Sequence, residues 1–324
     1  MPRVLLTGAT GFVGRSLLAH LKSANFRVRA LSRQPKTELS PDIEWLPCDL
    51  IAAKHFGDAL SDIDTVIHLA SRVHQFDQNG ETALNEYRRN NTEVTRRLAE
   101  EAGSKGIRRF IYISTIKVNG EKTGILDNGQ YQRFTETDTP EPEDAYAISK
   151  YEAEEALKGV CSNSEMEYVI LRPPLVFGPW VKANFLRLIA TINKGIPLPL
   201  ASVRNCRSLM YVENLSQIIE RCINHPVAAN RLFLVSDYDI SLPDLVRRIG
   251  KLLDKRLPLL PCPIALLKFA GYITGKQAVI RRLTESLVID NSRVKAELSW
   301  EPTFSLEDGL RNTLNWYKVF NNIN

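Results

Sequence analysis

The chain has 324 residues and a mass of 36.6 kDa, which suits two average domains or one large α/β unit. Hydrophobic residues make up 44% and charged residues 24% of the sequence, with a mean hydropathy of -0.18, and these values exclude disordered, collagen-like and membrane-embedded classes. The formal charge of +5 is modest and spread out, which argues against a nucleic-acid partner. The apolar run after Met1 is interrupted by Gly8 and is too short for a signal peptide, so we expect a cytoplasmic protein with no membrane partner.

The cysteines give no sign of a disulfide framework or a metal site. Their number is odd and no two of them form a CxxC pair: Cys48, Cys161, Cys206, Cys222 and Cys262. We therefore expect reduced thiols in packing roles and no bound metal.

Short runs rich in β-branched and aromatic residues alternate with helical patterns in the first half of the chain. Buried strands are predicted at Arg3–Thr7, Arg27–Leu31, Ile43–Pro47, Thr65–Leu69, Arg109–Ser114 and Tyr168–Leu171. Helices are predicted between them at Phe12–Ser23, Glu86–Gly103 and Tyr146–Leu157. This alternation predicts an α/β protein with a Rossmann-type, doubly wound parallel sheet.

The regular alternation of strands and helices ends after Pro173, where prolines and mixed short elements begin. We expect residues 1–172 to form the dinucleotide-binding domain, with elements near 208–235 returning to it. Residues 173–207 and 236–324 are expected to form a smaller C-terminal substrate-binding region. Within it, the apolar stretch Leu257–Ile273 contains prolines and falls short of the roughly 20 residues of a membrane span, so it predicts a buried helix behind a proline-rich loop.

The strongest local signal is the sequence TGATGFVG, residues 7–14, between the first predicted strand and the first predicted helix. Glycines there let the backbone approach a pyrophosphate, and the helix N-terminus offers N–H groups to it. The spacing is GxxGxxG. The motif predicts dinucleotide binding by Gly8, Thr10, Gly11, Phe12, Val13 and Gly14.

The end of the second predicted strand bears on which dinucleotide binds. An NAD-preferring protein usually has an acidic residue there for the ribose 2'-hydroxyl, but this chain has Leu31-Ser32-Arg33. Arg33 can pair with a 2'-phosphate, so NADP(H) is favoured over NAD(H); the alternative is a solvated loop cation. Asp49 and Leu50, after the third strand, are expected on the adenine side, although Asp49 also suits a helix cap.

Tyr146 and Lys150 form a YxxxK pair on one face of a predicted helix. An ammonium near a phenol lowers the pKa of the tyrosine toward working pH, which suits proton transfer at a carbinol. Tyr272 and Lys276 form a second such pair. Context favours Tyr146, because it opens a helix in the dinucleotide half, downstream of the hydroxyl pair Ser114-Thr115.

In their order along the whole chain, these motifs resemble the extended short-chain dehydrogenase/reductase superfamily, the NAD-dependent epimerase/dehydratase family. The matching segments are TGATGFVG, His68-Leu69-Ala70-Ser71, Asn91 in RNNTEVT, Ser114-Thr115, YAISK and residues 172–179 (RPPLVFGP). The resemblance implies an NAD(P)-dependent enzyme with Thr115, Tyr146 and Lys150 as catalytic residues. It implies further cofactor contacts at Leu69, Ala70, Ser71, Asn91, Tyr146, Lys150 and Pro173. Phe177 and Arg33 depart from the family pattern, and His68 is expected to be a buried histidine without a proton-transfer role.

Within that family, residues 116–121, 181–185 and 197–200 are similar to bacterial UDP-N-acetylquinovosamine dehydrogenases, the 4-ketoreductases of surface-polysaccharide synthesis. This similarity implies a UDP-sugar substrate, with Asn184 and Arg207 on the UDP part. Arg72, Thr115 and Lys117 are expected to contact substrate as well. The alternative for Arg207 is a surface strand cation, and for Arg72 and Lys117 a solvated charge.

The sequence thus predicts reduction at C4 of a UDP-4-keto-6-deoxy-N-acetylhexosamine for lipopolysaccharide precursors. The alternative is a UDP-hexose 4-epimerase, which uses the same residues and returns the hydride to the opposite face. A non-catalytic dinucleotide sensor on the same fold is an alternative of another class. The exact sugar and the oligomeric state stay open, a homodimer included.

Overall fold

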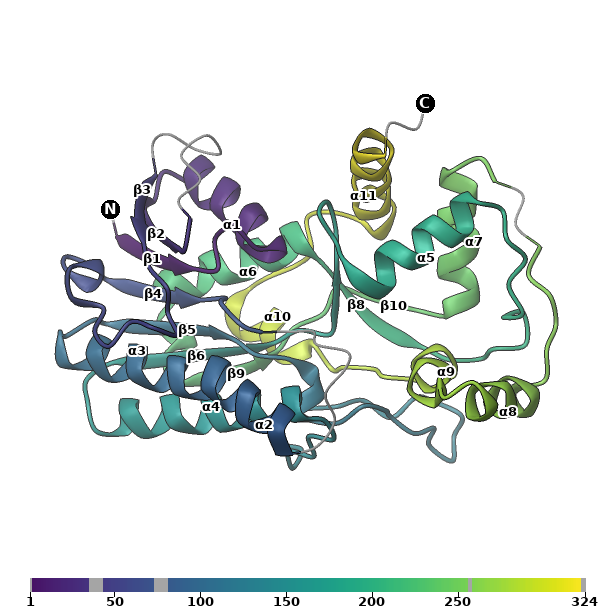
Figure 1. The fold of residues 1–324 in the computed structure, drawn as a ribbon, viewed down its shortest axis with the longest axis horizontal. Helices are drawn as coiled ribbons and strands as arrows, with labels where there is room; N and C mark the ends of the chain where they lie inside the picture. Colours follow the sequence, from purple (N-terminus) through teal and green to yellow (C-terminus); the bar gives the residue numbers. More distant parts are fainter. Residues whose placement is uncertain (1, 35–42, 73–80, 256–257, 322–324) are drawn as a thin grey trace.

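A seven-stranded parallel sheet organises the larger lobe of the molecule (Figure 1). The computed structural model describes residues 2–34, 43–72, 81–255 and 258–321. The strand order is β3-β2-β1-β4-β5-β6-β9, and each neighbouring pair is parallel. The strands are β1 (Arg3–Thr7), β2 (Arg27–Ser32), β3 (Glu44–Pro47), β4 (Thr65–His68), β5 (Arg109–Ile113), β6 (Glu167–Arg172) and β9 (Arg231–Leu234). The predicted strands and the Rossmann-type doubly wound fold are confirmed.

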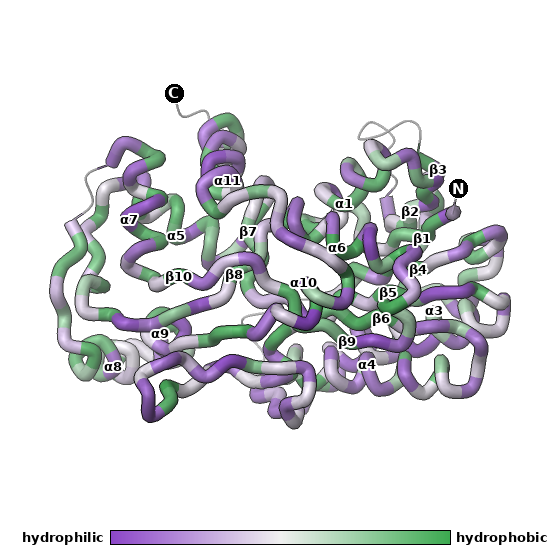
Figure 2. Tube along the Cα trace, turned by 180° about the vertical axis from the view of Figure 1, so that it is seen from behind, coloured by the Kyte–Doolittle hydropathy of each residue, from purple (hydrophilic) through white to green (hydrophobic). Residues whose placement is uncertain are grey.

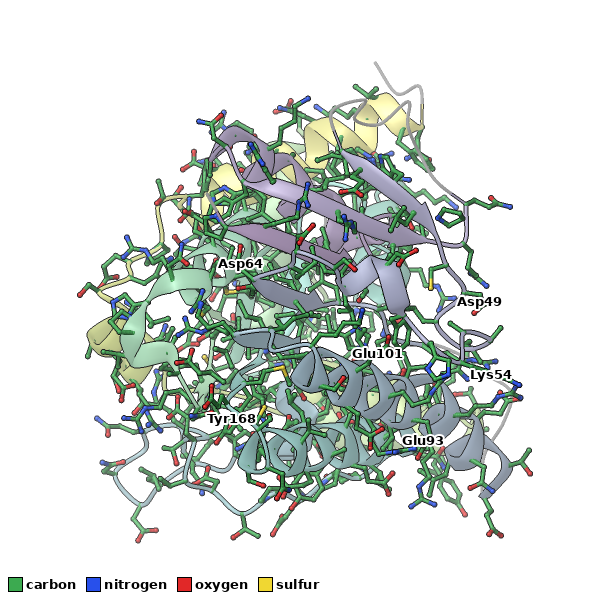
Figure 3. All side chains as sticks on the ribbon, turned by 90° about the vertical axis from the view of Figure 1, so that its left-hand side faces the viewer. Asp49, Lys54, Asp64, Glu93, Glu101 and Tyr168 are labelled. Atoms are coloured by element: carbon green, nitrogen blue, oxygen red, sulfur yellow. The ribbon has the colours of Figure 1, made fainter. Side chains whose placement is uncertain are left out.

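Helices cover both faces of this sheet, which is why its central strands are almost continuously apolar (Figure 1). One face carries α1 (Phe12–Ser23), α6 (Val212–Asn224) and α10 (Ser292–Leu298). The other carries α2 (Glu81–Tyr87), α3 (Glu93–Ser104) and α4 (Ala145–Ser162). On that side, Glu101 of α3 accepts the N–H groups of Phe56 and Gly57 at 2.7 Å each, which ties the segment after β3 to the helix layer (Figure 3).

The predicted helix at Glu86–Gly103 differs in its form. It begins earlier, as α2, passes through a π-helical turn at Arg88–Thr92 and continues as α3. The wide turn brings Asn91 into the interior, where its side chain is 1% exposed. π-Helical turns occur mostly at functional sites, and hydrophobic periodicity does not reveal them.

The smaller lobe has its own apolar core. Its sheet has the order β10-β8-β7 and is built from β7 (Leu175–Phe177), β8 (Arg207–Tyr211) and β10 (Tyr238–Ile240). The helices α5 (Ala183–Asn193), α7 (Leu242–Leu252) and α11 (Leu306–Phe320) pack on it, with Phe177 stacked on Phe185 at 5.5 Å between ring centroids. The chain therefore leaves the large sheet after β6 and rejoins it at β9, while β8 stays in the small sheet. The remaining short helices are Gly57–Leu60, Ile116–Val118 and Pro226–Ala228.

The prediction of a buried helix in Leu257–Ile273 is wrong. Leu257 lies outside the described residues, and α8 (Ile264–Ile273) buries only Leu267 and Gly271. Its packing partner is α9 (Gln277–Thr284), where a Cβ on Gly271 would lie 2.7 Å from Cγ1 of Ile280. The helix pair extends from the smaller lobe (Figure 1), and among the described residues no further layer covers the exposed side chains of α8. Among the helices in the described ranges, none combines the length and apolarity needed to cross a bilayer.

Candidate active site

The glycine-rich turn connects the end of β1 to the start of α1. Gly8 has a φ of +72°, which glycine tolerates at no steric cost. A Cβ on Gly14 would lie 2.1 Å from the carbonyl oxygen of Gly8 and 2.8 Å from Cα of Ala9. Gly11 is the N-cap of α1 and has no side-chain cap, which leaves first-turn N–H groups for a ligand. This close-packed, uncapped turn fits the pyrophosphate of a dinucleotide.

We expect Gly14→Ala to weaken cofactor binding by on the order of tenfold or more and to lower the free energy of unfolding by about 1–3 kcal/mol. The added methyl group meets backbone atoms, so α1 must shift away from the turn. Gly159→Ala is the matched control, because a Cβ on this helical glycine meets nothing within 4 Å. Nucleotide titration and urea unfolding measure both effects. Equal behaviour of the two variants would contradict the role given to the turn.

The predicted cofactor segments meet at the carboxyl ends of adjacent strands. The chain order reverses between β1 and β4, and ligands of open α/β sheets bind at such a switch point. Leu69–Ser71 follows β4, Thr115 lies just beyond β5, and Pro173 follows β6. The N–H of Ala70 donates to Oγ1 of Thr7 at 3.2 Å, and the N–H of Ile116 donates to the carbonyl of Pro173 at 2.9 Å.

Asn91 connects the loop after β4 to α4. Its Oδ1 accepts from the hydroxyl of Ser71 at 3.1 Å and from the N–H of Arg72 at 2.8 Å. Its Nδ2 donates to the hydroxyl of Ser149 at 3.0 Å. Ser149 directly precedes Lys150, so the Asn91 amide fixes the position of Ser71 relative to the YxxxK helix.

Tyr146 and Lys150 lie in the first two turns of α4, which Asp144 caps by accepting from the N–H of Ala147 at 2.7 Å. Lys150 is 1% exposed, and its ammonium donates to the carbonyl of Ile113 at 2.6 Å, at the end of β5. Thr115 follows two residues later and is 9% exposed. The structure therefore brings Tyr146, Lys150 and Thr115 together at one end of the sheet.

Burial dominates the electrostatics of this group. It lowers the pKa of Lys150 to about 7, against a smaller opposing effect of the Glu154 carboxylate. It also raises the pKa of Tyr146 above its usual value, with Asp144 adding to the shift and a hydrogen bond with Ser71 opposing it. The expectation that Lys150 lowers the pKa of Tyr146 is therefore wrong for the protein alone, because desolvation of the phenolate dominates the shift.

The shifted pKa of Lys150 predicts a pH dependence of stability. Between pH 7 and its ordinary value of 10.5, the folded protein binds fewer protons at this side chain than the unfolded chain does. Stability contributed by this group therefore rises with pH across that window. In urea unfolding of wild type and Lys150→Met, we expect the wild type to gain stability relative to the variant as the pH increases. Lys158 of the same helix is partly exposed and pairs with Glu155, so Lys158→Met should run parallel to wild type. Parallel curves for Lys150→Met as well would contradict the assignment.

Lys117 and Arg72, both predicted to contact substrate, are engaged in ion pairs. Lys117 Nζ contacts Oδ2 of Asp144 at 2.5 Å and also pairs with Glu121. Arg72 Nη1 lies 3.0 Å from Oε2 of Glu86. The solvated-charge alternative does not describe Lys117, which links the segment after Thr115 to the cap of the Tyr146 helix.

Arg207 and Asn184, predicted to contact UDP, lie in the smaller lobe. Arg207 is half-buried at the start of β8, and its Nη1 donates to the carbonyls of Arg282 at 3.3 Å and Glu285 at 3.2 Å. Asn184 is exposed in the first turn of α5. The alternative of a surface strand cation does not describe Arg207, because backbone carbonyls at the end of α9 hold its guanidinium.

Three residues predicted for the adenosine side lie at the ends of β2 and β3. Arg33 directly follows β2 and is exposed. Asp49 is exposed at the rim of the sheet, where its Oδ1 accepts from the N–H of Ile51 at 3.0 Å (Figure 3). It thus closes a turn and does not cap a helix. The carbonyl of Leu50 accepts from Nη2 of Arg97 at 3.0 Å.

A buried ion pair that the sequence did not predict lies one turn beyond Lys150 on α4. Glu154, one turn after Lys150, is 0% exposed and pairs with Arg172 at 2.5 Å (Oε2 to Nη2) and 3.0 Å (Oε1 to Nε). The hydroxyl of Ser114 also donates to Glu154, and Nη1 of Arg172 donates to Oδ1 of Asn119 at 2.8 Å. A signal for Glu154 existed, because it continues the helix face of Tyr146 and Lys150 at i+4 spacing.

His68 is fully buried, with Nδ1 2.7 Å from Oγ1 of Thr7, and burial lowers its pKa to about 3. The imidazole is therefore neutral at working pH. All five cysteines are free, and the described residues contain no group of three or more acidic, histidine or cysteine side chains placed to hold a metal ion.

Comparisons with known proteins identify the family of the chain. A model of the NAD dependent epimerase/dehydratase family matches residues 4–236. Over 326 residues, the chain is 40% identical to a UDP-glucose 4-epimerase of Vibrio cholerae, covering 99% of this chain and 98% of that protein. It is 27% identical over 328 residues, 97% of this chain and 94% of the other, to an N-acetyl-alpha-D-glucosaminyl-diphospho-ditrans,octacis-undecaprenol 4-epimerase of Escherichia coli O157:H7.

Solved structures share the fold over nearly the whole chain. The UDP-glucuronic acid 4-epimerase from Bacillus cereus in complex with NAD has a TM-score of 0.78 at 23% identity, covering 98% of this chain and 99% of that one. MoeE5 in complex with UDP-glucuronic acid and NAD has a TM-score of 0.78 at 22% identity, with the same coverage.

Proposed function

Because the chain belongs to the NAD dependent epimerase/dehydratase family, we propose that it transfers hydride at C4 of a UDP-sugar and that its net reaction is 4-epimerisation. It is an enzyme of a family that uses a nicotinamide dinucleotide. The observation that carries the proposal is the convergence of Tyr146, Lys150 and Thr115 beside the glycine-rich turn, in a chain aligned end to end with a UDP-glucose 4-epimerase.

The proposed roles follow from the chemistry of each side chain. The phenol of Tyr146 takes the proton of the sugar 4-hydroxyl as it becomes a carbonyl and returns it in the reverse step. Thr115 hydrogen-bonds the same sugar oxygen and holds it toward Tyr146. Lys150, fixed by the carbonyl of Ile113, would place its ammonium on the ribose of the dinucleotide.

The uncapped start of α1 and the glycines of the turn would hold the pyrophosphate, and Ser71, Asn91 and Pro173 would hold the nicotinamide end. When bound, the dinucleotide supplies the hydride acceptor and donor. An epimerase must keep its cofactor bound through the whole cycle. It must also let the 4-keto sugar rotate in the site, so that its opposite face receives the hydride.

Reduction of a UDP-4-keto-6-deoxy-N-acetylhexosamine is the second candidate. The observation that favours it is Arg33 at the end of β2 in place of an acidic residue, and the resemblance of residues 116–121, 181–185 and 197–200 to 4-ketoreductases suggested it from the sequence. A ketoreductase releases the oxidised cofactor after each turnover. Exchange of this kind suits a 2'-phosphorylated dinucleotide.

The two reactions differ in their cofactor balance. Purified protein is incubated with UDP-glucose, UDP-N-acetylglucosamine and the 4-keto-6-deoxy sugar nucleotide, with nicotinamide absorbance and product chromatography followed together. We expect C4 epimers to interconvert with no net change in absorbance. Stoichiometric consumption of reduced nicotinamide with the keto sugar, without epimer formation, would replace epimerisation by reduction, and no turnover of any UDP-sugar would overturn both.

We further propose that Arg33 sets cofactor choice. A guanidinium forms charge-assisted bonds to a 2'-phosphate, so Arg33→Ala should weaken NADP(H) relative to NAD(H) by roughly tenfold. Arg27→Ala is the control, because Arg27 is an exposed arginine at the opposite end of the same strand. Both affinities are measured by fluorescence titration. An unchanged ratio in Arg33→Ala would show that Arg33 is a solvated cation.

A further inference from the structure

The outward face of α8 is apolar and uncovered. Leu267 and Gly271 point toward the protein, whereas Leu266, Phe269, Tyr272 and Ile273 are 57%, 60%, 71% and 67% exposed. Their spacing of three, three and one residues places them on one side of the helix. Figure 2 shows α8 as an apolar segment at the edge of the molecule.

This pattern is the reverse of an ordinary surface helix, which turns its apolar stripe inward and its polar side to water. Leu260 and Val279, 48% and 47% exposed, flank α8 in the chain and add apolar surface. Large apolar side chains exposed together on one side of a helix mark an interaction surface. We call Leu266, Phe269, Tyr272 and Ile273 the α8 surface.

The charge of the same segment identifies the kind of partner. Residues 263–284 contain Lys268, Lys276, Arg281 and Arg282 and no acidic residue. Arg281 pairs with Glu143 and Glu285, whereas Lys268 and Lys276 form no ion pair within the part of the chain that the structure describes. Large apolar side chains flanked by unpaired lysines are the composition of an interfacial membrane helix.

The length of α8 determines how it would bind. Ten residues span about 15 Å, half the hydrocarbon thickness of a bilayer, so the helix can only lie in the interface plane. The α8–α9 pair lies at the end of the molecule opposite α3 and α4, which leaves its outer side accessible to a flat surface (Figure 1).

We propose that the α8 surface binds the headgroup region of a bilayer containing anionic lipids, with Phe269 and Tyr272 inserted and Lys268 and Lys276 on lipid phosphates. This proposal departs from the expectation, drawn from the sequence, that the protein has no membrane partner. Charge favours this partner over a second copy of the chain, because a two-fold contact through α8 would bring the lysines of both copies together. The α8 surface contains no residue of the proposed catalytic group, so this inference is independent of the sugar reaction.

Flotation with vesicles tests the proposal on the full chain. Vesicles of phosphatidylcholine alone are compared with vesicles containing about one third phosphatidylglycerol. We expect binding to the anionic vesicles that salt weakens. Phe269→Ser with Tyr272→Ser should weaken it by on the order of tenfold or more, and Lys268→Gln with Lys276→Gln by about fivefold for each lysine.

Val319→Ser with Phe320→Ser is the matched control. It removes an equal number of exposed apolar side chains, 78% and 65% exposed, from α11 and should bind vesicles like wild type. All variants should retain wild-type turnover, which shows that they are folded. Absence of vesicle binding by wild type, or equal loss in the α11 control, would overturn the proposal. If the wild type instead sediments as a dimer and does not bind vesicles, and Phe269→Ser with Tyr272→Ser sediments as a monomer, the α8 surface binds a second copy of the chain.

Discussion

In the Tyr146→Phe variant, we expect kcat to fall by roughly 10²-fold or more while cofactor binding is largely kept. The substitution removes only the hydroxyl group that would exchange a proton with the sugar. The ring keeps its edge contact with Tyr87 at 6.0 Å between centroids, so α4 and the cofactor side should be unchanged. Steady-state kinetics with the best UDP-sugar, together with nucleotide titration, measure the two effects separately.

Tyr272→Phe is the control for this prediction, because Tyr272 and Lys276 share the same spacing but lie at the exposed α8–α9 pair. We expect wild-type kcat from it. Normal turnover by Tyr146→Phe, with loss in Tyr272→Phe, would exchange the roles of the two pairs.

Arg172→Met should lower the free energy of unfolding by about 3–5 kcal/mol, because it leaves the buried Glu154 carboxylate without its partner. The ion pair joins β6 to α4, and Ser114 at the end of β5 also bonds to Glu154. Loss of the pair should therefore also disturb Thr115 and lower kcat. Urea unfolding gives the stability, and kinetics at a temperature where the variant is folded gives the activity.

Two further variants make this result interpretable. Glu154→Leu combined with Arg172→Met should regain most of the lost stability, since replacing both partners leaves no unpaired charge. Arg96→Met, which breaks an exposed pair with Glu93 and Glu100, should cost less than about 1 kcal/mol. If Arg172→Met costs no more than Arg96→Met, the buried pair does not hold β6 and α4 together.

The sequence by itself determined the sheet and the main features of the candidate site. The strands are short apolar runs between helical patterns, and both signals are local, so the strands of the large sheet could be predicted as far as β6. The glycine-rich turn and the YxxxK pair were recognisable for the same reason: their residues lie within a few positions of each other, and helix geometry alone places Tyr146 and Lys150 on one face.

Tertiary structure alone decided the contacts between distant residues. The partners of Asn91, Lys117 and Arg207 come from other elements, and the Glu154–Arg172 pair joins a helix to a strand. Burial fixes the pKa values of Tyr146 and Lys150, and burial depends on the whole protein around them. Composition marked Leu257–Ile273 as apolar, but only the absence of a covering layer within the described residues leaves α8 exposed, because hydrophobicity drives burial only where a complementary surface exists.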